Sequence, residues 1–199
     1  PSNDILALTD NILHEPLDGK VRDIVSRAKW VSARGTFGGY LHNFRVVGNV
    51  GSGEGGLSAD IKMAKEEDVR HRLQGRVKTS RLDMGELLSL NMLHDIDSDI
   101  VVDGSFGSRD SGGVRGDVDV DVSGLGLGNY RYTAISGMGH IDGDSYYAEL
   151  YADDPNMEFD LYANAELNEE MPTYMASLGL RRADLHALGI NRRDSVSVL

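Results

Sequence analysis

The sequence has no cysteine, which excludes disulfide bonds, thiol catalysis and cysteine-ligated zinc. It has only 4 prolines in 199 residues, so it is not a proline-rich disordered linker. No stretch approaches the ~20 consecutive apolar residues that a membrane-spanning helix needs. Its 20 Lys and Arg residues are outnumbered by 32 Asp and Glu residues, and the resulting net charge of -12 argues against nucleic acid as a partner and against electrostatic docking on anionic lipid headgroups.

Glycine and alternating apolar residues are abundant instead. The chain holds 24 glycines, well above the roughly 7% of ordinary usage, and 40% of its residues are hydrophobic. In Val114–Val122, every even position is apolar or glycine and every odd position is charged. This period of two predicts a strand with one dry face and one wet face.

The same alternation recurs along most of the chain. The gaps between the alternating segments are short and rich in Gly, Asn, Asp and Ser, which favours antiparallel neighbours. No helix of 10–15 residues is predicted between successive strands, so a parallel βαβ sheet is not expected. The pattern predicts an all-β, antiparallel meander. We expect strands near 30–37, 40–50, 56–64, 70–79, 94–106, 113–122, 129–140, 145–153 and 157–167.

Three short segments interrupt the alternation with the pattern Asp-apolar-x-x-Leu, at residues 4–8, 83–87 and 184–188. Aspartate can cap a helical turn, and the two apolar residues then lie on one side of it. We interpret these segments as capping turns of a degenerate internal repeat, although so loose a pattern also arises by chance. The expected organisation is a short helical or irregular segment (1–29), a first β-meander repeat (30–82), a capping turn or helix (83–93), a second β-meander repeat (94–182) and a capping turn that begins a further repeat (183–199).

Motifs that can signal chemistry are better explained by strands and turns. Gly51–Gly56 spells a dinucleotide-binding fingerprint, but an alternating strand follows it where that motif needs a helix. The aspartates of 95–99 and 117–121 resemble the start of a calcium loop and lack its later glycine and glutamate. Residues 110–113 resemble a serine-nucleophile loop without a histidine motif to support it. We therefore expect no enzyme activity, no catalytic residues, no cofactor and no metal site.

Five stretches, in order along the chain, resemble motifs of one known family. They are Gly35–Phe44 (G-x-F-x-G-x-L-x-N-F), Leu82–Leu88 (D-L-G-x-L-L), Tyr130–Tyr132 followed by Gly137 (Y-x-Y…G), Asp153–Phe159 (D-D-P-N-L-x-F) and Ala183–Leu188 (A-D-L-x-x-L). Together they resemble the TamB family of cell-envelope proteins, part of the AsmA-like group.

This resemblance implies a long sheet curled into an open, taco-like groove lined with apolar side chains. It implies a periplasmic portion of a protein that is anchored in the inner membrane of diderm bacteria and carries phospholipid toward the outer membrane, or supports outer-membrane biogenesis. The implied partners are phospholipid acyl chains and, through regions outside this chain, an outer-membrane assembly barrel protein. We expect the membrane anchor and the docking regions to lie outside these 199 residues.

The apolar faces of the predicted strands are the candidate site. Composition alone fits a closed two-sheet core, as in a structural or adhesin-like surface repeat, as well as an open groove. The resemblance favours the groove, and unpaired strand edges would also favour self-association. The candidate lining is Leu57, Ile61, Met63, Ile96, Ile100, Val102, Val118, Val120, Met138, Leu150, Phe159 and Leu161.

Overall fold

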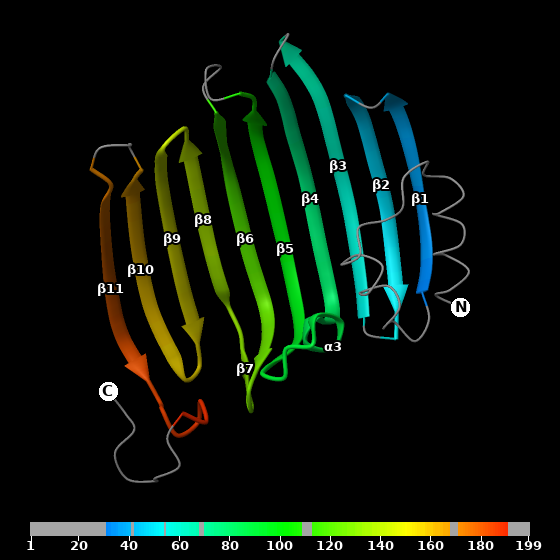
Figure 1. Ribbon diagram of the computed structural model, residues 1–199. Coiled ribbons are helices and arrows are strands. Elements are labelled where there is room, and N and C mark those ends of the chain that lie inside the picture. Colours follow the sequence, from blue (N-terminus) through cyan, green and yellow to red (C-terminus); the bar gives the residue numbers. More distant parts are fainter. Residues whose placement is uncertain are drawn as a thin grey trace.

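The computed structural model describes residues 31–40, 42–53, 55–67, 70–108, 113–167 and 171–190, and places their strands in one antiparallel sheet (Figure 1). The strands are β1 (Val31–Tyr40), β2 (Asn43–Ser52), β3 (Gly55–Glu67), β4 (Arg70–Asp83), β5 (Leu93–Phe106), β6 (Val114–Leu127), β7 (Tyr130–Tyr132), β8 (Ile135–Asp142), β9 (Ser145–Asp154), β10 (Met157–Glu166) and β11 (Thr173–Ala183), and the described helix is α3 (Met84–Leu88). Their order is β1-β2-β3-β4-β5-β6-β8-β9-β10-β11, with β7 paired to β6. The predicted all-β meander, curled and not closed, is confirmed.

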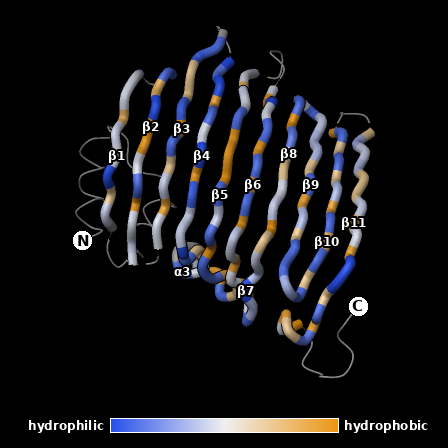
Figure 2. Tube along the Cα trace, turned by 180° about the vertical axis from the view of Figure 1, so that it is seen from behind, coloured by the Kyte–Doolittle hydropathy of each residue, from blue (hydrophilic) through white to orange (hydrophobic). Residues whose placement is uncertain are grey.

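The pairing register keeps the alternation of every strand in step with that of its neighbours. Residues directly opposite each other in an antiparallel pair point to the same face, so the register assigns each side chain to a face. Figure 2 shows hydrophobic and hydrophilic positions following one another along the strands. One row of directly paired residues crosses the sheet through Phe37, Val46, Ile61, Gly75, Val102, Val118, Gly139, Ala148, Ala163 and Ala176.

Three further rows lie on the same face, at steps of two residues along each strand. They cross β5 at Gly104, Ile100 and Ser98. None of the four rows contains Asp, Glu, Lys, Arg or His over the ten strands from β1 to β11. We call this surface the charge-free face. Charged groups return beyond the rows, where the strands end, as at Asp154 and His71.

The opposite surface, here the charged face, carries ion pairs between neighbouring strands. Their N–O distances are 2.7 Å for Arg45–Asp60, 3.0 Å for Arg72–Asp103, 2.8 Å for Lys78–Asp99 and 2.7 Å for Arg181–Asp160. Solvent screens ion pairs at such a surface, so these pairs fix register more than they stabilise the sheet.

The sheet has no second layer among the described residues. The hydrophobic side chains buried there are Leu82, Ala152, Ala183 and Leu188, and all of them lie near the end of the sheet that carries α3. The described part of the chain contains no helix with the length and apolar character needed to cross a membrane. The described residues therefore do not form the closed two-sheet core that composition allows.

Two of the three predicted capping turns are in the described residues, and both are capped as expected. Asp83 begins α3, and its side chain accepts a hydrogen bond from the backbone N–H of Glu86 at 2.8 Å. Asp184 accepts from the backbone N–H groups of His186 and Ala187 at 3.1 and 3.0 Å. Both turns follow a strand that runs toward the same end of the sheet (Figure 1). The turn predicted at 4–8 and the segment 1–29 lie outside the described residues.

The strand predictions differ from the structure in two places. The single strand expected at 129–140 is two strands, β7 and β8, because the backbone breaks at Ala134, which has a left-handed φ of 49°. The strand β11 was not predicted, because apolar residues such as Tyr174 and Met175 occupy consecutive positions and blur its alternation.

The second capping turn provides a test of this arrangement. Leu188 is 4% exposed and Ile190, two residues later, is 66% exposed. Leu188→Ala should lower the free energy of unfolding by about 2–5 kcal/mol, since it removes buried methyl groups and leaves a cavity. Ile190→Ala should change it by less than about 0.5 kcal/mol. Urea unfolding followed by circular dichroism measures both, and equal losses would contradict the packing of this turn.

Candidate functional site

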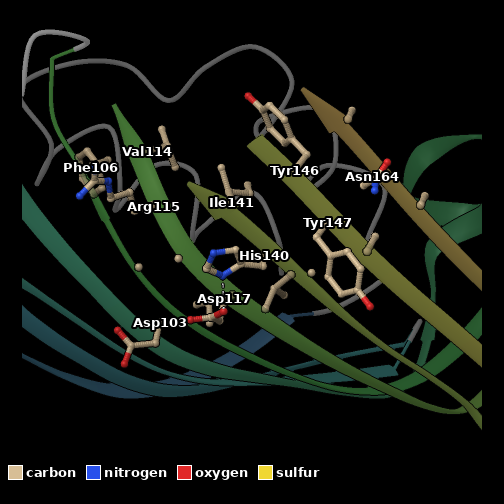
Figure 3. A pocket seen from close by; sticks show the side chains of 18 of the residues that line it. Asp103, Phe106, Val114, Arg115, Asp117, His140, Ile141, Tyr146, Tyr147 and Asn164 are labelled. Carbon is tan, nitrogen blue, oxygen red and sulfur yellow. Dashed lines mark hydrogen bonds and ion pairs between the residues drawn. The ribbon is translucent and has the colours of Figure 1, made fainter. Parts of the chain in front are cut away.

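A groove of about 740 Å³ lies on the charge-free face, in the half of the sheet away from α3. Its lining runs from Leu73 on β4 to Tyr174 on β11, because the sheet curls enough for these strands to border one space. Figure 3 shows Ile141 and Tyr146 on one side of the strands, with Asp117 and Tyr147 on the other. The curl therefore turns part of an apolar sheet face into a trough.

Small residues form the floor of this groove. Gly139, Ala148, Ala163 and Ala176 are direct neighbours across β8 to β11, and all of them line it. A side chain at Gly139 would meet Cγ1 of Val118 at 2.9 Å, so glycine keeps this part of the floor low. The larger residues stand in the rows on either side. They are Ile141, Tyr146 and Tyr174 on one side and Leu150, Leu161 and Leu178 on the other.

The register places most of the candidate lining residues on the charge-free face. Those in its four rows are Leu57, Ile61, Met63, Ile100, Val102, Val118, Val120, Leu150, Phe159 and Leu161. Ile96 lies two residues before Ser98 on β5 and continues the same face. Only Val102 and Val118 of this set border the groove itself. The others extend the apolar surface beyond it.

Met138 is the exception, and its assignment to the lining was wrong. It pairs with Asp119 and Glu149 and lies on the charged face, where it is largely exposed. The prediction continued the alternation of Tyr130 and Tyr132 through the break at Ala134. The backbone turns at that residue, and β8 resumes with the opposite phase.

Sequence reasoning did not select the groove floor. It recognised the alternation that contains Ala148 and Ala163, but it chose the larger residues as the lining. Several small residues at directly paired positions mark a depression, and this signal is visible only once the register between strands is known.

The aspartates of 95–99, which resemble the start of a calcium loop, form ion pairs on the charged face. Asp99 pairs with Arg76 and Lys78, and their hydrogen bonds hold the pKa of its carboxyl well below the usual range. Arg131 reaches both Asp95 and Asp97. No cluster of three or more potential metal ligands occurs among the described residues. The glycines of 51–56 belong to the β2–β3 hairpin, and a strand follows them.

A fully buried carboxylate lies beside the charge-free face, at the end of β9. One oxygen of Asp154 accepts from the Tyr130 hydroxyl at 2.5 Å and the Asn156 backbone N–H at 2.9 Å. The other accepts from the backbone N–H and the hydroxyl of Thr133, at 2.8 and 2.9 Å. Burial by itself raises the pKa of Asp154, but the hydrogen bonds from these three residues outweigh it and hold the pKa below its usual value.

This cluster joins two of the stretches that carry the family resemblance. Tyr130 comes from the Y-x-Y stretch, and Asp154 with Asn156 comes from the D-D-P-N stretch. The side-chain amide of Asn156 also donates to the Tyr130 hydroxyl at 3.0 Å. The contact fixes β7 and the break before β8 against the β9–β10 turn.

No protein-family model, no curated protein and no solved structure matches this chain.

Replacing the buried carboxylate tests its structural role. Asp154→Asn puts an amide N–H₂ where an acceptor oxygen stood, so it should lower the free energy of unfolding at pH 7 by roughly 1.5–3 kcal/mol. Because the folded-state pKa is depressed, the wild-type carboxylate contributes its stability above about pH 4 and loses it as the pH falls further. The difference between the two proteins should therefore shrink below pH 4.

The neighbouring residue is the control for this test. Asp153 is exposed, and Asp153→Asn should leave the unfolding curve nearly unchanged at both pH values. Urea unfolding at pH 7 and pH 3 measures all three proteins. A difference between wild type and Asp154→Asn that does not depend on pH would contradict the assigned charge state.

Proposed function

We propose that this chain is a non-enzymatic part of a cell-envelope protein, and that its charge-free face carries the acyl chains of phospholipids. The observation that carries the proposal is the combination of four rows without charge over ten strands and the absence of a second layer over those rows among the described residues. A soluble protein normally buries such a surface against a second layer, and a large exposed apolar patch marks a binding surface.

The dimensions and energetics suit an acyl chain. The rows run across the strands, and at ~4.8 Å between neighbouring strands the ten strands give a path of roughly 45 Å. Each methylene buried on this surface contributes about 0.8 kcal/mol, whereas a charged headgroup gains nothing there and stays in water. The groove of about 740 Å³ gives the acyl chain a recessed position on this path.

The resemblance to the TamB family supports the cellular setting of this proposal. We propose that the chain lies in the periplasm as part of a protein anchored in the inner membrane, and that it moves phospholipid toward the outer membrane or supports outer-membrane biogenesis. An outer-membrane assembly barrel protein would be contacted through regions outside these residues. A structural or adhesin-like repeat is the alternative that the following tests separate from lipid carriage.

Two adjacent tyrosines allow a matched crosslinking test. Both tyrosines border the groove, but the side chain of Tyr146 lies on the charge-free face and is 40% exposed, whereas the side chain of Tyr147 lies on the charged face and is 38% exposed (Figure 3). Replacing Tyr146 with the photoreactive p-benzoylphenylalanine should capture phospholipid in cells, detected by mass spectrometry of the purified protein. The same replacement at Tyr147 should capture at least tenfold less. Equal capture at both positions, or none at Tyr146, would favour a structural repeat.

A charge placed in the groove should block binding without unfolding the chain. Val118 borders the groove in a sheet that has no covering layer, so Val118→Asp faces solvent when lipid is absent and should keep the β-sheet circular dichroism spectrum. It should lower co-purified phospholipid in native mass spectra by at least tenfold.

The control for Val118→Asp is a valine on the opposite face. Val101 pairs with Arg76 and Asp119 on the charged face, and Val101→Asp should leave phospholipid binding unchanged. Unfolding of the Val118→Asp protein would indicate that a closed core covers this position. Unchanged phospholipid binding by a folded Val118→Asp protein would exclude the groove as the lipid path.

A further inference from the structure

Three tyrosines surround one carboxylate on the charged face, over β9 and β10. The hydroxyl of Tyr147 donates to one oxygen of Glu149, and the hydroxyl of Tyr151 donates to the other at 2.5 Å. Tyr162 lies directly opposite Glu149 on the neighbouring strand, and its hydroxyl oxygen is 2.9 Å from that of Tyr151. We call these four residues the tyrosine–glutamate cluster.

The alternation of the strands brings this cluster together and leaves its rings accessible. Tyr147, Glu149 and Tyr151 follow one another at steps of two on β9, so their side chains project from the same face. The rings of Tyr151 and Tyr162 stand at 87° to each other, with centroids 5.8 Å apart. Tyr147 and Tyr162 remain 38% and 37% exposed. The cluster therefore presents aromatic surface to solvent around a carboxylate.

The carboxylate of Glu149 is charged and has no cationic partner. Hydrogen bonds from Tyr147 and then Tyr151 hold its pKa below the usual value, so it is ionised at neutral pH. Among the described residues, no Lys, Arg or His forms an ion pair with it. Asp60 and Asp99 on the same face are instead paired with Arg or Lys.

The basic residues of the strands around the cluster are engaged elsewhere. Those of β8 to β11 are His140, Arg181 and Arg182. His140 is hydrogen-bonded to Asp117 at 2.7 Å, and Arg181 pairs with two carboxylates of β10. The Arg182 guanidinium donates to a backbone oxygen at 2.9 Å. The negative charge of Glu149 is therefore left for a cation from outside these strands.

The surroundings of Glu149 suit an organic cation better than a metal ion. A hard metal ion takes several oxygen ligands, and no group of three or more potential metal ligands occurs in the part of the chain that the structure describes. Aromatic faces, by contrast, attract organic cations through the ring quadrupole. Met138, directly opposite Glu149 on β8 and 42% exposed, adds a polarisable apolar side chain. Because both carboxylate oxygens already accept from tyrosine, a cation that needs no hydrogen bond fits best.

We propose that the tyrosine–glutamate cluster binds the quaternary ammonium group of a small soluble molecule. Glu149 balances the positive charge, and the methyl groups pack against the rings of Tyr151 and Tyr162. Cation–π contacts at exposed sites are weak, so the dissociation constant should be millimolar. The cluster lies on the face opposite the four charge-free rows, so this proposal does not depend on whether the groove carries lipid.

Choline and its neutral carbon isostere, 3,3-dimethyl-1-butanol, separate charge from shape. Choline should shift the backbone amide NMR signals of residues 147–151 and 162 with a millimolar dissociation constant, and the isostere should bind at least tenfold more weakly. Equal binding of the isostere, or no shift at ~50 mM choline, would overturn the proposal. Equal shifts with sodium chloride would indicate an acidic surface only, and tighter binding of N-acetylarginine amide would assign the cluster to an arginine side chain of a partner protein.

A matched pair of variants tests the role of the carboxylate. Glu149→Gln keeps the shape of the side chain and removes its charge, so it should weaken choline binding at least tenfold. Glu158→Gln lies on the same face, beside Arg181, and should leave choline binding within twofold. Choline binding that survives Glu149→Gln would contradict the proposal. Val118→Asp should bind choline like the wild type, which separates this test from that of lipid carriage.

A second pair tests the ring faces. Tyr162→Leu removes one aromatic wall and should weaken choline binding about fivefold, whereas Tyr162→Phe keeps the ring and should stay within twofold. Tyr40→Leu, at an 85% exposed tyrosine of β1, should have no effect. Circular dichroism confirms that each variant keeps the sheet. Equal losses in Tyr162→Leu and Tyr162→Phe would show that the ring face does not hold the cation.

Discussion

The structure depends on keeping a two-residue alternation in register through ten successive strands. A slip of one residue in any strand would turn all of its charged side chains to the apolar side. Register shifts do occur, between Lys65 and Glu67, Thr79 and Leu82, Leu93 and Ile96, Asp97 and Ser98, and Glu158 and Phe159. They lie toward the strand ends, outside the stretches that form the four rows. The bulges therefore bend the margins of the sheet and leave the charge-free face continuous.

Where the alternation does change phase, a specific contact stabilises the change. Tyr132 and Ile135 both lie on the apolar side although they are three residues apart, which requires one extra residue and the left-handed backbone of Ala134. The backbone N–H and the hydroxyl of Thr133 donate to the buried carboxylate of Asp154, so these two donors at the break are satisfied. The charge is placed at the end of the sheet, where the neighbouring turn can enclose it.

The sequence predicted the features that depend on a single segment and missed those that depend on backbone breaks or on the pairing between strands. Alternation in single strands was enough to predict an antiparallel meander, and aspartate chemistry was enough to predict the caps at Asp83 and Asp184. Met138 was assigned to the wrong face because the backbone breaks at Ala134, and an alanine gives no signal of such a break in the sequence. The groove floor at Ala148 and Ala163 was missed because it depends on how neighbouring strands pair, and this register is not visible in any one segment. β11 was missed because an edge strand with apolar residues on both faces has no two-residue period.

A single-layer sheet has little hydrophobic core to stabilise it and leaves apolar surface exposed. Its charged face and net charge of -12 keep the molecule soluble, and ladder hydrogen bonds with exposed ion pairs hold the strands, because the described hydrophobic core is confined to a few side chains near α3. The uncovered apolar face and the uncharged edge of β11 still expose groups that gain free energy from a partner. The face offers apolar area and no backbone groups, which suits an acyl chain. The edge of β11 offers backbone donors and acceptors in a strand geometry, which water or another strand can satisfy.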